Sequence, residues 1–199
     1  IDKYNDRREE EDMEIGNREF NFGQGPVYIM GILNVTPDSF SDGGRFNDKD
    51  AALRHVEEMV KQGADIIDVG GESTRPGYQK ITVPEEIARV TGIIEAVKAR
   101  FDVPISIDTY KAPVMDAALA AGADLANDIW GLRYDKLFAP DGQTSVWECG
   151  TMAEIIAKHD VPVCVMHNRK EAVYTDFLKE VKEDLSDSIA IGENAGIDR

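Results

Sequence analysis

The feature that most constrains this chain is a five-fold alternation of short apolar runs with longer amphipathic segments. The apolar runs, which we expect to be strands, cover residues 27–34, 64–70, 104–108, 123–128 and 162–167. Helical periodicity or a capping signal predicts helices over 48–62, from Thr82 to about residue 100, over 113–121, from Thr151 onward and over 177–192. Because the strand runs are apolar on both faces, the alternation predicts an α/β fold in which helices cover a parallel sheet.

Two architectures share this alternation, and the pattern alone leaves both open. A doubly wound sheet is complete with about five or six strands, whereas a (β/α)8 barrel needs eight strands and about 250 residues. In both, ligands bind at the carboxyl ends of the strands. Polar side chains stand at that end of four expected strands: Asn34, Asp108, Asn127 and His167.

The chain is strongly acidic, with a net charge of −16 from 22 basic and 38 acidic residues. Surfaces for nucleic acid or anionic membranes need local cationic excess, so we expect neither partner. No apolar run approaches the ~18 residues of a membrane span and no signal peptide is evident, which predicts a cytoplasmic protein. Two cysteines, Cys149 and Cys164, are too few for a disulfide framework and lack the spacing of a structural zinc site. An anionic ligand would need a local cation or a helix N-terminus.

The N-terminal segment has a different character from the rest. Ten charged residues lie between Asp2 and Glu14, without apolar periodicity. We therefore expect residues 1–15 to form a solvated tail or linker and residues 16–199 to form the folded part. Because the chain opens with Ile1, this end is interpreted as a cut end.

Two loops after strands carry unusual composition. NVTPDSFSDGG (34–44) is rich in turn residues and contains Phe40, which has no apolar neighbour in the loop and would suit a lid over a substrate. GGESTRPG (70–77) offers backbone N–H groups, hydroxyls and Arg75 to an anion, but it matches neither a dinucleotide loop nor a Walker A loop. Each loop also has a plainer interpretation. Residues 34–44 could simply form a turn-rich loop, and Arg75 could be a solvated surface residue.

The strand-end polar residues likewise have two interpretations each. Asp108 either caps the next helix or accepts hydrogen bonds from a ligand, and Asn127 repeats its position one strand later. Asp68 is either a structural acid or a site residue, and His167 is more simply structural than catalytic. No arrangement of Ser, His and Asp indicates a protein nucleophile.

Taken together, these motifs resemble a known family. MGILNVTPDSFSDGG (30–44) and ADIIDVGGESTRPG (64–77) are similar to the two signature segments of dihydropteroate synthases. SIDT (106–109), NDI (127–129) and MH (166–167) resemble that family's third, fourth and fifth strand ends, in the right order. The resemblance covers roughly residues 16–199 and implies a (β/α)8 TIM barrel, of which this chain carries about the first five βα units.

The resemblance implies an alkyl transfer in folate biosynthesis. In it, 6-hydroxymethyl-7,8-dihydropterin diphosphate condenses with 4-aminobenzoate to give 7,8-dihydropteroate and diphosphate. A buried carboxylate suits the donor edge of a pterin, and Mg²⁺ with fixed donors would stabilise the departing diphosphate. The amine attacks the exposed methylene, so no protein nucleophile is needed.

Site residues follow from the same resemblance. Catalytic positions correspond to Asn34, Asp42 and Arg75, with Asn34 also holding the metal and Asp42 ordering the first loop. The remaining implied contacts are the pterin with Asp108, Asn127 and Met166, the diphosphate with Thr74 and Arg75, and the aminobenzoate with Phe40 and Pro76. Sulfonamide inhibition follows by analogy from the aminobenzoate site.

The chain also departs from the family. The family continues with further strands that supply a second pterin carboxylate, a lysine and an Arg/His pair. We therefore expect these residues to be part of a longer chain, poorly stable and inactive alone, and a homodimer when full length. Residues 132–150 make a longer loop than the family predicts, which favours a packed surface insertion without a catalytic role over a lid or a subunit contact.

Two alternative functions remain. A pterin-dependent methyltransferase domain would share the barrel but not the loop at 34–44. A noncatalytic pterin-binding fragment is compatible with Asp108 and Asn127 alone.

Overall fold

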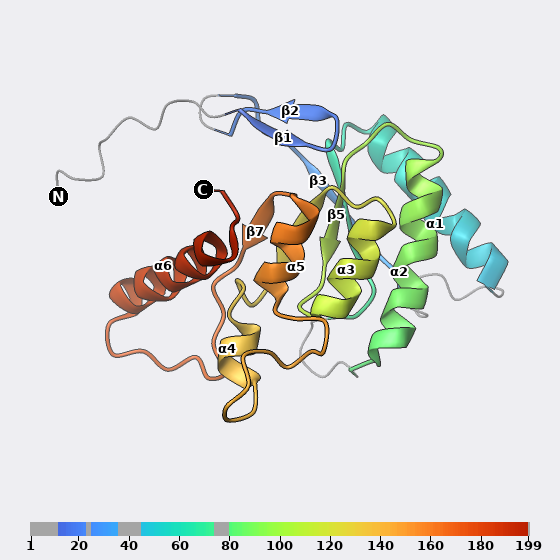
Figure 1. Cartoon of the computed structure of the whole chain (residues 1–199). Coiled ribbons are helices and arrows are strands. Elements are labelled where there is room, and N and C mark those ends of the chain that lie inside the picture. Colours follow the sequence, from blue (N-terminus) through green and yellow to red (C-terminus); the bar gives the residue numbers. More distant parts are fainter. Residues whose placement is uncertain (1–11, 23–24, 36–44, 74–79, 199) are drawn as a thin grey trace.

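A computed structural model describes residues 12–22, 25–35, 45–73 and 80–198 of the chain, without the side chains of 45–48. Its centre is a five-stranded parallel sheet with the order β3-β4-β5-β6-β7 (Figure 1). The strands are β3 (Met30–Asn34), β4 (Ile66–Gly70), β5 (Ile105–Asp108), β6 (Leu125–Asp128) and β7 (Val163–Val165). Each strand pairs with the next one along the chain, so the order never reverses as it does in a doubly wound sheet. The order is that of a barrel wall.

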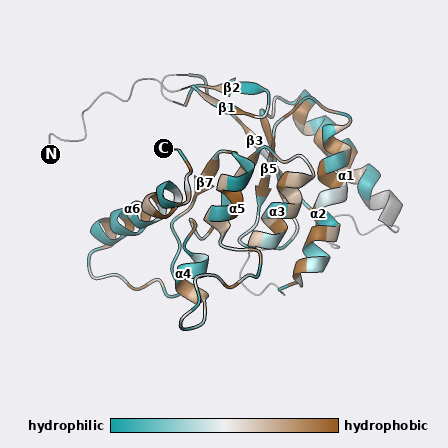
Figure 2. Cartoon of the chain, viewed as in Figure 1, coloured by the Kyte–Doolittle hydropathy of each residue, from teal (hydrophilic) through white to brown (hydrophobic). Residues whose placement is uncertain are grey.

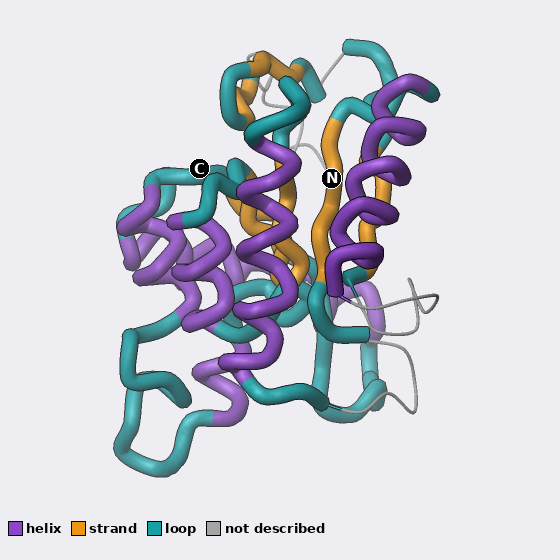
Figure 3. The backbone as a smooth tube through the Cα atoms, turned by 90° about the vertical axis from the view of Figure 1, so that its right-hand side faces the viewer, coloured by secondary structure: helices purple, strands orange, loops and turns teal. Residues whose placement is uncertain are grey.

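Helices cover one face of this sheet (Figures 1 and 3). The helix α1 packs on β3, α2 on β4 and α3 on β5, and α2, α3, α5 and α6 also pack on one another in sequence. Their bounds are α1 (Arg45–Lys61), α2 (Val83–Lys98), α3 (Ala112–Ala120), α4 (Tyr134–Phe138), α5 (Met152–His159) and α6 (Phe177–Ala195). This packing buries alternate strand residues completely, among them Leu33, Val69, Ile107 and Ala126. The intervening side chains therefore face the other side, called here the open face.

Local signals at the helix starts are confirmed. The Thr82 hydroxyl accepts a hydrogen bond from the Glu85 N–H at 3.4 Å. Thr151 forms a full capping box, because its hydroxyl accepts from the Glu154 N–H at 3.2 Å and Glu154 Oε2 accepts from the Thr151 N–H at 2.7 Å. The prediction of five βα units between residues 27 and 195 is therefore confirmed.

Some predicted bounds are wrong. The first strand begins at Met30 rather than residue 27, because the preceding backbone bonds to Asp65 instead of a strand: Ile29 N–H donates to Asp65 Oδ2 at 2.7 Å. The helix α1 begins earlier than predicted, at Arg45, and α6 continues to Ala195. There Gly196, with a φ of 95°, provides the left-handed cap that ends α6.

An N-terminal hairpin corrects the expected tail. The strands β1 (Met13–Ile15) and β2 (Arg18–Phe20) pair antiparallel, and residues 1–11 lie outside the described chain. Ile15 and Phe20 are buried against Ile66 and Leu125. The folded part therefore begins before residue 16, and the tail prediction is wrong for 13–15, because two apolar side chains outweigh the charged residues around them. Figure 1 shows the hairpin at the end of the sheet opposite α4, and its buried side chains pack on Ile66 and Leu125, the first residues of β4 and β6.

The segment 132–150 is packed onto the fold. The buried carboxylate of Asp135 accepts hydrogen bonds from the Ser145 hydroxyl at 2.8 Å and from the backbone N–H groups of Val146 at 2.9 Å and Met152 at 3.2 Å. Trp147 packs against the main hydrophobic core. Figure 2 shows that apolar residues lie mainly where helices meet the sheet. The predicted packing of this segment is confirmed. That it is an insertion relative to the family, and that it lacks a catalytic role, stay predictions.

Candidate active site

One row of residues crosses the carboxyl edge of the sheet. The strand register aligns Asn34 with Gly70, Gly70 with Asp108, Asp108 with Asn127 and Asn127 with Cys164. Each residue of this row follows one that packs against the helices, so the row lies on the open face. The strand-end prediction for Asn34, Asp108 and Asn127 is therefore confirmed as a spatial grouping.

Gly70, which stands between Asn34 and Asp108 in the row, leaves room between these two side chains. A methyl group on Gly70 would lie 3.7 Å from Asn34 Oδ1 and 3.8 Å from Asp108 Oδ2. The amide oxygen of Asn34 and the carboxylate of Asp108 thus flank the Gly70 backbone from the two adjacent strands. The row presents oxygen acceptors on both sides of a gap without a side chain.

A second layer of polar groups lies one step toward the amino ends of the strands. Asp68 Oδ1 accepts a hydrogen bond from the Ser106 hydroxyl at 2.6 Å and one from Asn127 Nδ2 at 3.3 Å. Asp68 is 6% exposed and Ser106 is fully buried. Because Asp68 engages one N–H of Asn127, it fixes the orientation of that amide. This supports the structural interpretation of Asp68.

Asp108 is the most perturbed acid of the row. Burial, followed by the negative charges of Asp68, Glu86 and Asp128, raises its pKa to about 7. Its Oδ1 atom is buried and receives no hydrogen bond within the described structure. A buried acceptor without a donor is costly and uncommon in native proteins. Asp108 is therefore arranged to accept hydrogen bonds from a molecule that brings its own N–H groups.

The chain turns directly after β6 ends at Asp128. Burial raises the pKa of Asp128 to about 6, although the N–H groups of Trp130 and Leu132 donate to its carboxylate at 2.9 and 2.7 Å. The carbonyl of Asp128 also accepts from the Met166 N–H at 3.1 Å. Met166, the predicted floor of the pterin pocket, is thereby tied to the end of β6 and remains 45% exposed.

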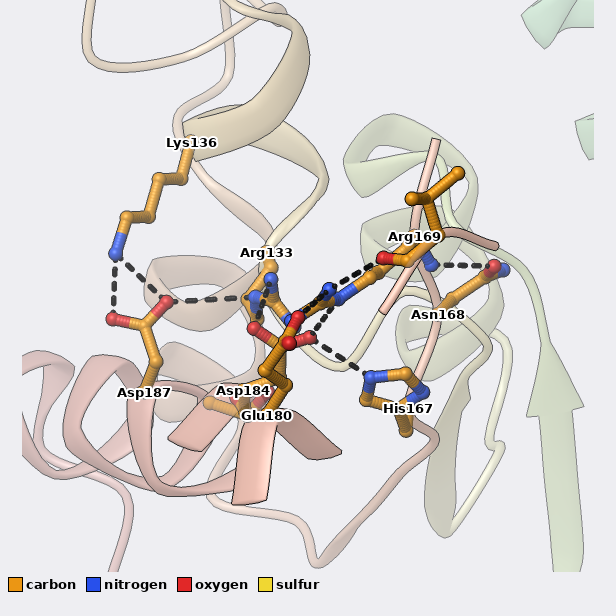
Figure 4. A network of polar contacts seen from close by, with 10 residues as sticks. Arg133, Lys136, His167, Asn168, Arg169, Glu180, Asp184 and Asp187 are labelled. Atoms are coloured by element: carbon orange, nitrogen blue, oxygen red, sulfur yellow. Dashed lines mark hydrogen bonds and ion pairs between the residues drawn. The ribbon is translucent and has the colours of Figure 1, made fainter. Parts of the chain in front are cut away.

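The residues after Met166 are held by helix α6 (Figure 4). Asp184 Oδ2 accepts hydrogen bonds from His167 Nε2 at 2.8 Å and from Arg169 Nε at 2.6 Å, and Asp184 Oδ1 lies 3.0 Å from Arg133 Nη2. Burial opposes ionisation of Asp184, but the hydrogen bonds from Arg169 and His167 and the charge of Arg133 lower its pKa to about 2. These contacts support the structural interpretation of His167, because its ring binds an acid on the outer helix.

Five predicted site residues cannot be placed. Phe40, Asp42, Thr74, Arg75 and Pro76 lie outside the described residues. Their roles stay predictions from the resemblance.

Sequence reasoning missed several polar residues next to the row. Ser106 lies beneath Asn127, and a buried cluster of Glu72, Glu86, Thr109 and Lys111 follows the ends of β4 and β5. Glu72 and Thr109 stand inside the quoted motifs, but Glu86 and Lys111 lie on or before helices and have no strand-end signal. Only the fold brings them together.

Comparison with known families places the chain among its relatives. A family model described as pterin binding enzyme matches residues 30–199, which is most of the chain. The chain belongs to the pterin-binding enzyme family.

Named relatives of this pterin-binding enzyme are dihydropteroate synthases. One from Clostridium beijerinckii is 53% identical over 185 residues, which cover 93% of this chain and 63% of the relative. A solved dihydropteroate synthase from Clostridium difficile, in the presence of pteroic acid, has 45% identity and a TM-score of 0.77, covering 94% of this chain and 63% of that one. The Xanthomonas albilineans dihydropteroate synthase with 4-aminobenzoic acid has 39% identity and a TM-score of 0.79, with the same shares covered.

These matches confirm the expected barrel and exclude the doubly wound alternative. The chain spans less than two thirds of the length of these relatives. Among the residues that the structure describes, no helix combines the length and apolar character needed to cross a bilayer. The same residues hold no group of three or more His, Cys, Asp or Glu side chains placed to bind a metal ion.

Proposed function

We propose that the protein to which this chain belongs is a dihydropteroate synthase. It joins 6-hydroxymethyl-7,8-dihydropterin diphosphate to 4-aminobenzoate and releases diphosphate. The observation that carries the proposal is the buried Oδ1 atom of Asp108, which has no partner among the described residues and lies beside Asn127 at the carboxyl edge of a barrel wall. The pteroic acid and 4-aminobenzoic acid of the solved relatives are a product-like molecule and a substrate of this reaction.

The pterin is recognised by complementary hydrogen bonds. Its 2-amino group and ring N–H form a donor edge, which an ionised Asp108 accepts. Asn127, held by Asp68, contributes donors and an acceptor from the adjacent strand. Met166 lies against the same edge and supplies an apolar surface for the ring.

The diphosphate end lies toward Asn34 in this proposal, together with Thr74 and Arg75 from the second loop. A Mg²⁺ ion keeps several waters and binds few protein oxygens when a phosphate supplies the others. The single exposed amide oxygen of Asn34, free of a crowding side chain at Gly70, fits that requirement. When bound, the ion would neutralise charge that develops on the leaving oxygen.

The chemistry then depends on positioning rather than on a protein nucleophile. Asp108 and Asn127 hold the pterin so that its methylene carbon is exposed toward the aminobenzoate, whose amine forms the new C–N bond as the C–O bond to diphosphate breaks. Phe40 and Pro76 flank the aminobenzoate, and Asp42 orders the first loop. We also propose that sulfonamides compete with the aminobenzoate there, and that the whole protein is a homodimer.

A coupled assay for diphosphate release tests the function. Purified protein of recorded intact mass is incubated with the pterin diphosphate, with and without 4-aminobenzoate and Mg²⁺. Turnover that requires all three and disappears in D108N is the expected result for the whole protein. Pterin binding without product would instead favour a noncatalytic pterin-binding module, and dependence on a corrinoid partner would favour a methyltransferase.

A further inference from the structure

A buried charge cluster connects the ends of β4 and β5 to helix α2. Lys111 Nζ lies 2.6 Å from Glu86 Oε2, 2.8 Å from Glu72 Oε2 and 2.9 Å from the carbonyl oxygen of Ile81. The three charged side chains are 5% (Lys111), 3% (Glu72) and 2% (Glu86) exposed. One ammonium group therefore joins residues from three separate parts of the chain in a dry environment.

Further hydrogen bonds extend the cluster to the residues of the row. The Thr109 hydroxyl donates to Glu86 Oε1 at 2.8 Å and accepts from the Lys111 N–H at 3.3 Å. Glu72 Oε2 also accepts from the Ile81 N–H at 2.7 Å. Thr109 directly follows Asp108, and Glu72 stands two residues after Gly70. The cluster thus holds both strand ends that flank the candidate pterin site.

Stability alone is a weak reason for such a cluster. Two carboxylates and one ammonium group leave a net negative charge in a buried place, and a buried ion pair contributes little compared with well-packed apolar side chains. Glu72 Oε1 is buried and receives no hydrogen bond within the described structure. The cluster lies at the ends of the two strands that carry Gly70 and Asp108, and this location points to a role in the geometry and electrostatics of the row.

We propose that Lys111 is a positioning residue for pterin recognition. Its ammonium group holds the ends of β4 and β5 in place and neutralises the Glu86 carboxylate that acts on Asp108 from helix α2. This inference rests on the proposed function, because it assumes that Asp108 binds the pterin as a carboxylate. Lys111 itself is buried beneath the strand ends, so it acts through Glu72 and Glu86 rather than on the pterin directly.

The electrostatic part of the proposal gives a distinctive readout. Among the described residues, the charges that act on Asp108 come from Asp68 on β4, Glu86 on α2 and Asp128 on β6, and all are negative. Removing the positive charge of Lys111 leaves Glu86 uncompensated, so Asp108 becomes harder to ionise. Pterin binding, which needs the carboxylate, is then lost at a higher pH than in the wild type.

The experiment measures the dissociation constant of 6-hydroxymethylpterin between about pH 5.5 and 9. The variants are K111M, the conservative K111R and the control K98M, in the whole protein. Lys98 also forms an ion pair with a partly buried carboxylate: its Nζ atom lies 2.9 Å from both oxygens of Asp124. This pair lies at the amino edge of the sheet, away from the row. Because the same probe is used with every variant, a difference in the pH midpoint of binding arises from the protein and not from titration of the probe.

K111M is expected to weaken binding at pH 7 by about tenfold or more and to raise the pH midpoint by about one unit. K111R is expected to stay within about threefold of the wild type, because it keeps the charge. K98M is expected to lower the thermal midpoint and leave both binding parameters unchanged. Wild-type affinity and midpoint in folded K111M overturn the proposal.

A second variant covers the case in which K111M does not fold. E86Q retains a hydrogen-bond acceptor for Thr109 and removes the negative charge, so the pH midpoint is expected to fall. An unchanged midpoint in E86Q overturns the electrostatic role of the cluster. If the wild type fails to bind the probe at every pH, the proposed function fails and this inference with it, whereas wild-type binding with unaffected variants rejects Lys111 alone.

Discussion

Asp68 and Asp108 face the same side of the sheet from neighbouring strands, with Asp68 one register step nearer the amino ends. Their strands align Asp68 with Ser106 and Gly70 with Asp108. The negative charge of Asp68, after burial, is the largest contribution to the raised pKa of Asp108. Two acids of one open face therefore have different roles. Asp68 is hydrogen-bonded to Ser106 and Asn127, whereas one carboxylate oxygen of Asp108 accepts no hydrogen bond from the part of the chain that the structure describes.

The raised pKa of Asp108 predicts a cost in stability at neutral and higher pH. The pKa of Asp108 in the folded state, about 7, exceeds its ordinary value of 3.8. The contribution of this group to the free energy of unfolding is therefore fully present below about pH 4 and is lost as the pH rises through 7. D108N carries no charge at this position. Its free energy of unfolding should exceed that of the wild type by ~1–3 kcal/mol at pH 8 and should differ little from it at pH 4.5. Urea unfolding at both pH values measures this. Equal stabilities at pH 8 would contradict the burial of an ionised Asp108.

Removing the charge of Asp68 should make Asp108 more acidic. D68N keeps an oxygen for the Ser106 hydroxyl but eliminates the neighbouring negative charge. We expect the pH midpoint for pterin binding to fall by roughly 0.5–1 unit. The control S106A removes the hydrogen bond and keeps the charge, so its midpoint should stay near the wild-type value. An equal shift in both variants would assign the effect to structure rather than charge.

The two adjacent glycines at the end of β4, Gly70 and Gly71, should respond differently to alanine substitution. A Cβ atom on Gly71 would lie 2.8 Å from Val90 Cγ1 and 2.9 Å from Glu86 Cγ, whereas the Cβ of G70A would meet only ordinary contacts at 3.7 Å or more. G71A should therefore lower the free energy of unfolding by ~1–3 kcal/mol, and G70A by less than about 1 kcal/mol. In the proposed function, G70A weakens substrate binding because its methyl group enters the gap between Asn34 and Asp108. Thermal unfolding and probe titration of both variants separate the two effects; a destabilised G70A with normal binding would reject the placement.

Helix α6 offers a matched pair of acids. Asp184 contacts His167, Arg169 and Arg133, whereas Asp187 contacts the exposed Lys136 at 2.6 Å and Arg133 at 3.4 Å (Figure 4).

D184N should destabilise the fold by ~1–3 kcal/mol, since it leaves two arginines without their shared carboxylate. D187N should cost about 0–1 kcal/mol, as for a surface pair. Chemical denaturation measures both, and hydrogen exchange at Met166 and His167 should rise only in D184N. A larger loss in D187N would mean that Asp184 is not the centre of the network.

Much of this arrangement is predictable from the sequence for local reasons. Apolar runs, the caps at Thr82 and Thr151, and polar residues at strand ends depend on periodicities and short hydrogen bonds that neighbouring residues make. The start of β3 is less predictable, because the Ile29 N–H donates to the side chain of Asp65, which lies just before β4, instead of continuing the strand. The N-terminal hairpin of Met13–Ile15 and Arg18–Phe20 is also hard to predict, because its two buried residues, Ile15 and Phe20, stand among charged residues.

The sequence by itself determined the βα alternation, the edge at which Asn34, Asp108 and Asn127 stand, and the family resemblance carried by two loops. Tertiary structure alone decided the register that joins these three residues in one row and the layer of Asp68 and Ser106 beneath them. It also assembled Glu72, Glu86 and Lys111, which are separated by up to 39 positions. The reason is physical: strand register and the burial of a charge depend on all the elements packed around a residue, and no local pattern contains that information.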